Sequence, residues 1–331
     1  MTGSTSSPQD ASYSKKLVLI DGSALLHRAY HAMPGLTNGQ GKIVNAVYGF
    51  FSMFLGVLHE QKPDYIIVAF DRSKPTIRQS LFAGYHEHRP PMESDLSDQV
   101  GLIDELLEKM KVQVSFADGY EGDDVIGTFA HQSKIENRKS KNGEKIEVVI
   151  VTGDRDMLQL VDEKTRVLML ITGMSKTALF DEKMVEEKYG VKSSQFVDYK
   201  ALIGDPSDGY PGITGIGPKT ASSLLQKFGT FEALYERLGE VPEKVALKLA
   251  TDAEQGALAK KLAKIMTDAP VHLKLESCRV DLLDTQALRR GFEEHKFKSL
   301  ITRLDARYPA PIAPVKKVEK SSEEEGQLGL L

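Results

Sequence analysis

The sequence has little cysteine and no long apolar segment. Cys278 is its one cysteine among 331 residues, which excludes a disulfide framework and is typical of a reducing compartment. The longest nearly apolar stretch, Ala46 to Leu58, is too short to span a bilayer. The first residues, MTGSTSSPQDASYS, lack the charged start and apolar stretch of a signal peptide. We therefore expect a cytoplasmic protein with no membrane partner.

Charge of neither sign dominates the chain. The net charge is −4, with 41% hydrophobic and 27% charged residues, as in ordinary globular proteins. Nine clustered carboxylates contribute −9 of this charge, which leaves +5 on the rest of the chain. Because partners respond to local fields, an acidic centre flanked by basic surface remains compatible with nucleic acid.

Carboxylates are concentrated in short motifs and at predicted strand ends. Holding so much negative charge together costs several kcal/mol unless cations neutralise it. Oxygen ligands without His or Cys favour Mg²⁺ or Mn²⁺ over zinc, and such a site suits phosphoryl transfer on a phosphodiester. The nine acidic residues are Asp21, Asp71, Glu121, Asp123, Asp124, Asp154, Asp156, Asp205 and Asp208.

Apolar runs typical of strands alternate with helical patterns in the first half of the chain. We expect strands at 16–20, 64–70, 112–116, 146–151 and 166–170, and helices at 45–60, 95–110 and 123–132. This alternation predicts an α/β fold with a mostly parallel sheet and helices on both faces. Asp21, Asp71 and Asp154 each follow a predicted strand, where ligands gather in such sheets.

Composition divides the chain into four parts. We expect a disordered N-terminal tail at 1–15, an α/β metal-binding core at 16–180, a helical subdomain at 181–308 and a flexible tail at 309–331.

Two of the acidic motifs also have a simple structural interpretation. Asp154 could cap a helix, and Asp123 and Asp124 could lie near a helix N-terminus because the helix dipole favours them there. Glu121 could act beside either of these two, which point in different directions on a helix and could serve two metals. The clusters taken together favour metal binding over these local explanations.

The segment 204–228 is the most specific part of the sequence. Gly215 and Gly217 surround a tight turn before a helix that carries Lys219 and Thr220. Glycines let backbone N–H groups approach a ligand closely, and a helix N-terminus attracts phosphate. The GIGPKTA spacing is that of helix–hairpin–helix elements, which hold a DNA backbone without reading its sequence. An ordinary glycine-rich turn between helices is the alternative.

Five motifs, in order, resemble the 5′-nuclease domain of bacterial DNA polymerase I, within the flap endonuclease family. They are VLIDGSALLHRAYHAMP, VAFDRSKPTIRQSLFAGYHEHRPPM, GYEGDDVIGTFA, VTGDRDMLQLV and YKALIGDPSDGYPGITGIGPKTA, and the resemblance covers roughly 16–308. It implies a Rossmann-like, PIN-like sheet with a helical arch at about 73–96 and a C-terminal helix–three-turn–helix subdomain. It also implies 5′-3′ exonuclease or flap endonuclease activity on DNA with a 5′ flap, nick or RNA primer.

The same resemblance implies cofactors and residue roles. It implies two Mg²⁺ ions, which Mn²⁺ could replace, and a K⁺ ion at the helix–hairpin–helix turn is a further candidate. Arg78 and Arg89 would contact the scissile phosphate and Tyr85 could stack on an unpaired base, a solvated basic face being the alternative. Arg28 is another phosphate candidate. The first metal group would be Asp21, Asp71, Glu121, Asp123 and Asp124, and the second Asp154, Asp156, Asp205 and Asp208.

Two positions depart from the family pattern. His86 stands where the family has lysine, and because histidine titrates near pH 6.5 we expect weaker phosphate binding and a steeper pH dependence. Gly209 replaces an asparagine, and the missing amide would loosen the loop that holds Asp208. All nine acids are present, so we expect activity to persist.

The last five residues, QLGLL, are similar to the QL-x-L-F peptides that dock on the bacterial sliding clamp. Leucine stands in the place of the phenylalanine, and a plain disordered tail is the alternative. The residues that would contact a clamp are Gln327, Leu328, Leu330 and Leu331.

The favoured function is a Mg²⁺-dependent, structure-specific 5′-nuclease of DNA replication and repair, acting in the bacterial cytoplasm at the nucleoid. It would select substrates by shape. A PIN-like ribonuclease would carry similar acids but lack the GITGIGPKTA element. A non-catalytic DNA-structure-binding module would have lost several acids. The chain could also be the front portion of a longer polymerase, although no polymerase domain fits within these 331 residues.

Overall fold

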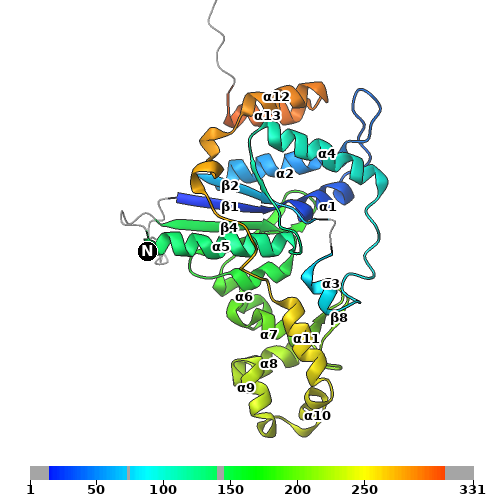
Figure 1. Ribbon diagram of the computed structural model, residues 1–331, viewed down its shortest axis with the longest axis vertical. Coiled ribbons are helices and arrows are strands. Elements are labelled where there is room, and N and C mark those ends of the chain that lie inside the picture. Colours follow the sequence, from blue (N-terminus) through cyan, green and yellow to red (C-terminus); the bar gives the residue numbers. More distant parts are fainter. Residues whose placement is uncertain (1–14, 73–74, 140–144, 310–331) are drawn as a thin grey trace, which may run out of the picture.

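A six-stranded sheet forms the centre of the molecule (Figure 1). The computed structural model describes residues 15–72, 75–139 and 145–309. The strand order is β3-β2-β1-β4-β5-β6, and all neighbours are parallel except β5 and β6. The mostly parallel sheet is therefore confirmed. The strands are β1 (Lys15–Asp21), β2 (Tyr65–Ala69), β3 (Gln113–Ser115), β4 (Ile146–Thr152), β5 (Thr165–Thr172) and β6 (Lys176–Phe180).

Helices cover both faces of this sheet because its strands are apolar on both sides. Leu17 and Leu19 of β1 face the layer that contains α5, whereas Val18 and Ile20 face the opposite layer. Figure 1 shows α2, α4, α12 and α13 above the sheet and α5 below it. These helices are α1 (Gly22–Ala32), α2 (Asn45–Gln61), α4 (Ser94–Lys109), α5 (Gly122–Lys139), α12 (Thr285–Glu294) and α13 (Lys298–Arg307).

The last two helices lie in a different place from the one the sequence suggested. We expected 181–308 to form one helical subdomain, but α12 and α13 return to the α/β part of the chain. Phe292 of α12 packs edge-on against Phe51 of α2, with the ring centroids 5.4 Å apart. The buried apolar face of these helices explains their return, since it completes the core layer above the sheet.

A second, mostly helical region lies below the sheet in Figure 1. A two-stranded hairpin, β7 (Gly204–Asp205) and β8 (Tyr210–Pro211), lies between two of its helices. A Cβ on Gly204, which has φ +72°, would lie 2.3 Å from the Gly212 nitrogen, so the two arms of the hairpin require glycine. The helices are α6 (Glu182–Tyr189), α7 (Phe196–Ile203), α8 (Pro218–Phe228), α9 (Phe231–Glu236), α10 (Glu243–Thr251) and α11 (Ala253–Ala263).

The arch segment contains little helix among its described residues. Only α3 (Ile77–Leu81) and the first turn of α4 are helical there, and Ser73 and Lys74 lie outside the described residues. Thr76 starts α3 by capping it through its side chain, and Phe82 ends it in an extended conformation. Short 3₁₀ helices occur elsewhere, at η1 (Arg155–Leu160), η2 (Ser193–Gln195), η3 (Leu238–Glu240), η4 (Leu275–Cys278) and η5 (Val280–Leu282).

The chain reverses its direction across the sheet between β1 and β4. It runs outward from β1 through β2 to β3, and then continues on the other side of β1 with β4. A crevice forms at the carboxyl ends of the strands at such a point. Asp21 ends β1, and Asp154 follows β4. Within the described residues, no helix is both long and apolar enough to cross a membrane.

Candidate metal centre

Eight of the nine predicted carboxylates line one continuous acidic cleft. It comprises two adjoining cavities of about 240 Å³ and 640 Å³ at the carboxyl ends of the strands. The α/β part supplies most of the acids, and the β7–β8 hairpin supplies two. The lining acids are Asp21, Asp71, Glu121, Asp123, Asp154, Asp156, Asp205 and Asp208.

Asp21 and Asp154 both cap a helix and face this cleft. Asp21 accepts the Ala24 backbone N–H at 2.8 Å with one oxygen and the Thr152 hydroxyl at 2.7 Å with the other. Asp154 caps η1 by accepting the backbone N–H of Asp156 at 2.8 Å. The capping and metal-binding interpretations of these residues are therefore compatible, because a carboxylate oxygen has more than one lone pair.

Asp71 and Glu121 are positioned by contacts between loops. The Gly122 backbone N–H donates to Asp71 at 2.7 Å, at the start of α5. Glu121 accepts from the Thr76 hydroxyl at 3.0 Å and from the Tyr85 hydroxyl at 3.0 Å. The arch segment thus holds one of the acids through two neutral donors.

Asp124 lies apart from the other acids. Its side chain is fully buried, and both its oxygens pair with the Arg78 guanidinium at 2.8 Å. It also accepts the Met266 backbone N–H at 2.8 Å. We predicted Asp124 as a first-group metal ligand, but its oxygens are occupied by a bidentate ion pair that joins α5 to α3.

Arg78 is likewise placed differently from the prediction of a phosphate contact. Its side chain is 3% exposed and also pairs with Glu121 at 2.9 Å. It donates to the backbone carbonyls of Leu262 and Lys264, both at 2.9 Å. Partners on two segments, 121–124 and 262–264, surround the guanidinium, so the physical reason for its burial is charge neutralisation inside the protein.

Burial disfavours the charged form of several acids that face the cleft, which fits divalent cations. Burial, followed by the charge of Asp71, raises the pKa of Asp21 to about 7. Burial also raises the pKa of Asp156 to about 7 and that of Asp123 well above its usual value. Asp123 Oδ1 is buried without a hydrogen-bond partner among the described residues. Because these groups lose charge when no cation is near, an oxygen-only set of this kind suits Mg²⁺ or Mn²⁺.

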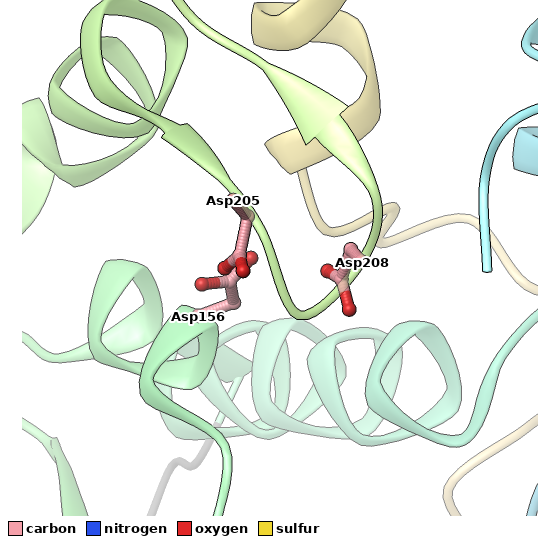
Figure 2. Close-up of side chains that lie close together, drawn as sticks. All are labelled: Asp156, Asp205 and Asp208. Carbon is pink, nitrogen blue, oxygen red and sulfur yellow. The ribbon is translucent and has the colours of Figure 1, made fainter. Parts of the chain in front are cut away.

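Three acids come close enough together to share one ion. The carboxylate oxygens of Asp156, Asp205 and Asp208 lie within 4.8 Å of one another. Figure 2 shows Asp205 and Asp208 on the hairpin and Asp156 opposite them on η1. Two structural units thus contribute ligands to the same position.

Lys200 belongs to this centre, although the sequence reasoning did not identify it. It lies on α7, and its ammonium is 2.6 Å from Asp156 Oδ1 and also contacts Asp205. Burial lowers the pKa of Lys200, but the two carboxylates together raise it above its ordinary value. Burial alone would raise the pKa of Asp205, but Lys200 and Ser207 together lower it below its ordinary value. The available signal was a lysine five residues before Asp205, in the motif YKALIGD.

The arch segment is closed over the hairpin. His86 Nε2 lies 3.1 Å from an Asp208 oxygen, and Arg89 donates to the same oxygen at 2.8 Å. The Tyr85 ring is 5% exposed and stacks on the His86 ring, with centroids 3.9 Å apart. In this arrangement Tyr85 has little free surface for an unpaired base, in contrast to our prediction, because the hairpin covers it.

Gly209 makes the closure possible. A Cβ there would lie 2.8 Å from the Gly84 carbonyl oxygen, and the residue has φ +80°. The His86 backbone N–H donates to the Asp208 carbonyl at 2.9 Å beside it. We expected the missing asparagine to loosen this loop, but the absent side chain instead lets two backbone segments touch. The two departures from the family pattern therefore lie in direct contact.

The nucleic-acid candidates at the turn before α8 do not line the acidic cleft. Gly215, Gly217 and Lys219 are exposed around the turn before α8, and Thr220 is half-buried. The Gly215 carbonyl accepts the Lys248 ammonium at 2.9 Å.

Arg28 lies beside the acidic cleft. It donates to the Leu170 carbonyl at 2.8 Å, so its guanidinium is partly engaged by the protein. The clamp-like peptide 327–331 lies outside the described residues.

Comparison with known proteins agrees with this arrangement. The helices and strands form a resolvase-like α/β domain followed by a helical SAM fold. Residues 16–190 match the model "5′-3′ exonuclease, N-terminal resolvase-like domain", and 191–286 match "5′-3′ exonuclease, C-terminal SAM fold". The chain belongs to the 5′-3′ exonuclease family, which confirms the resemblance found in the sequence.

Similar curated proteins are bacterial DNA polymerases I. That of Bacillus subtilis is 37% identical over 291 residues, which are 88% of this chain and 32% of the relative. That of Caldicellulosiruptor bescii is 38% identical over 291 residues, 87% of this chain and 33% of the relative. The chain therefore spans about a third of the length of the curated relatives it matches.

Solved structures share the fold at low sequence identity. The T5 D15 protein co-crystallised with metal ions has a TM-score of 0.61 at 20% identity, over 85% of this chain and all of that one. The catalytic core of Rad2 in complex with DNA has a TM-score of 0.55 at 15% identity, over 88% of this chain and 93% of that one. Human GEN1 in complex with Holliday junction DNA has a TM-score of 0.59 at 14% identity, over 89% of this chain and 72% of that one.

Proposed function

We propose that the chain is a Mg²⁺-dependent, structure-specific 5′-nuclease that hydrolyses phosphodiesters in DNA. The observation that carries this proposal is the convergence of eight carboxylates on one cleft at the switch point of the sheet. Membership of the 5′-3′ exonuclease family supports the same reaction class. A site of this kind has one evident use, which is to hold cations against a phosphate.

Two groups of oxygen ligands would hold the ions. Asp156, Asp205 and Asp208 would form one group. Asp21, Asp71 and Asp123, with Glu121, would form the other, and Asp154, which the family resemblance assigned to the group of Asp156, would lie beside them in the same cavity. Bound divalent ions supply an activated water and stabilise the charge that develops on the phosphoryl oxygens. Mn²⁺ should substitute, since its ligand preference is similar.

The chain's own cations would bind and orient the substrate. Arg89 is half-exposed at the mouth of the cleft, and His86 lies beside it. Both donate to Asp208 in this structure, and a phosphate would offer them equivalent acceptors. Arg28 lies near Gly153 at the cleft margin and could contact a neighbouring phosphate.

Duplex binding would use the turn before α8. The exposed backbone of Gly215 and Gly217 and the Lys219 ammonium face solvent there, as contact with a sugar-phosphate backbone requires. K⁺ at this turn would have to share the Gly215 carbonyl with Lys248. Recognition would therefore depend on shape and salt concentration rather than on base sequence.

We infer that the substrates are DNA with a 5′ flap, a nick or an RNA primer, met in the bacterial cytoplasm during replication and repair. The T5 D15 flap endonuclease, Rad2 and GEN1 are structural neighbours in complex with DNA. The sliding clamp is a further candidate partner through the peptide at 327–331, which could be tested by its deletion.

A flap-cleavage assay tests the function. A labelled 5′-flap duplex would be incubated with the wild type, with Asp154→Ala/Asp156→Ala and with the control Glu187→Ala, each in Mg²⁺ and in EDTA. Glu187 is exposed on α6, outside the acidic cleft. We expect flap release by the wild type and the control in Mg²⁺ only, and none by the double variant.

Other outcomes would identify the alternatives. Tight binding of the flap without cleavage in Mg²⁺ or Mn²⁺ would favour a non-catalytic DNA-binding module. Cleavage of single-stranded RNA in preference to any flap would favour a PIN-like ribonuclease. Cleavage that persists in the double variant would show that the reaction uses a different site.

A further inference from the structure

The acids of the cleft differ in how the protein compensates their charge, and in the first group Arg78 pairs with Glu121 at 2.9 Å and lies 3.9 Å from Asp123. Asp21, Asp71 and Asp154 accept hydrogen bonds from hydroxyl or backbone donors, and none forms an ion pair with another described residue. The other group has dedicated cations. Lys200 pairs with Asp156 and Asp205, and Arg89 pairs with Asp208.

Lys200 contacts two of the three acids that come close enough together to share one ion. Its two partners, Asp156 and Asp205, belong to the three acids with carboxylate oxygens within 4.8 Å of one another. The Lys200 side chain is only 10% exposed, and it lines the larger of the two cavities. An ammonium and a divalent ion held by the same carboxylates repel each other, so each weakens the binding of the other.

The backbone of the metal-free fold holds Lys200 close to Asp205. Its helix α7 ends directly at Gly204, where the hairpin with Asp205 begins. A long, flexible lysine side chain can leave the site by rotation without moving this backbone. Removal of either charge alone would leave a buried, unpaired partner.

We propose that Lys200 is an intramolecular cation that competes with the divalent ion for Asp156 and Asp205. It keeps the metal-free centre folded and lowers the metal affinity of this position relative to the Asp21 group. Binding of the ion requires the ammonium to withdraw. This inference rests on the proposed metal-dependent function.

Mn²⁺ binding by isothermal calorimetry, without substrate, tests the proposal. Wild type would be compared with Lys200→Met, Lys200→Arg and the control Lys260→Met. Lys260 is a matched control because it also joins two carboxylates, Asp198 and Glu232, each at 2.6 Å, and does not line the acidic cleft. Thermal unfolding in EDTA and in Mn²⁺ would be measured on the same proteins.

We expect Lys200→Met to bind its weaker Mn²⁺ ion roughly tenfold more tightly or better, as removal of one competing ion pair implies. The same variant should melt at a lower temperature in EDTA and gain more than wild type from Mn²⁺. Lys200→Arg should resemble wild type, and Lys260→Met should lose stability without a change in Mn²⁺ affinity. Equal or weaker Mn²⁺ binding by Lys200→Met would overturn the competition.

A measurement on unmodified protein covers the case in which Lys200→Met does not fold. Acetylation of lysines by an amine-reactive ester, mapped by mass spectrometry, should label Lys200 slowly in EDTA and faster in Mn²⁺. Lys260 should be labelled equally in both. If calorimetry shows Mn²⁺ bound but Lys200 is labelled equally with and without the ion, the proposed role of Lys200 is overturned while the metal centre stands. Absence of any Mn²⁺ binding would instead overturn the metal centre of the proposed function, and this inference with it.

Discussion

Replacement of Gly209 by asparagine, the residue typical of the family, should destabilise this particular chain. The new Cβ would lie 2.8 Å from the Gly84 carbonyl oxygen, closer than a carbon and an oxygen can approach. The arch segment must then move away and lose the 2.9 Å hydrogen bond from the His86 N–H to the Asp208 carbonyl. One such bond is worth about 1 kcal/mol, and the positive φ of +80° costs an asparagine a similar amount.

Gly173→Asn is the matched control for this experiment. Gly173 has φ +61° at the turn between β5 and β6, and a Cβ there would meet nothing within 4 Å. Urea unfolding should therefore show Gly209→Asn to be less stable than Gly173→Asn by roughly 1 kcal/mol, the contribution of the lost hydrogen bond. Hydrogen exchange of the His86 amide should be faster only in Gly209→Asn. Equal stability of the two variants with a protected His86 amide would refute the proposed contact.

Two further predictions concern the charged groups. Arg78→Met should lower the free energy of unfolding by about 3–5 kcal/mol in urea, because it leaves Glu121 and Asp124 buried without their partner; a loss below about 1 kcal/mol would contradict this. Burial raises the pKa of Asp21 and Asp156 to about 7, because the folded protein favours their protonated form. The stability that these protonated carboxyls contribute at low pH is lost as the pH rises through 7. Thermal unfolding should therefore show a larger gain from Mg²⁺ at about pH 8 than at about pH 5, and a gain independent of pH would argue against ligation by these acids.

The sheet and the acidic cleft follow from features that a sequence shows directly. Buried parallel strands are continuous apolar runs, as in IEVVIV at 146–151, and the chain must turn at a crevice after each one. The edge strand β6 was not expected, because its residues, KTALF, are half-exposed and mix polar with apolar side chains. The short strands β7 and β8 were also missed, since two residues each give no periodicity.

The partners of individual side chains could not be predicted, because they come from distant segments. Arg78 is surrounded by carbonyls almost two hundred positions away in sequence, at Leu262 and Lys264. Lys200 resembles any other helix lysine until the fold brings Asp156 to it. His86 and Gly209 could each be recognised as unusual, but only the structure shows that they touch.

The division of the acids between the α/β part and the β7–β8 hairpin has a consequence for biosynthesis. Asp156 emerges from the ribosome about fifty residues before Asp208, and the hairpin is held only once its second strand has followed. Arg78 must also wait for the chain beyond α11 before its carbonyl partners exist. A nascent or prematurely ended chain would thus carry an incomplete acidic centre.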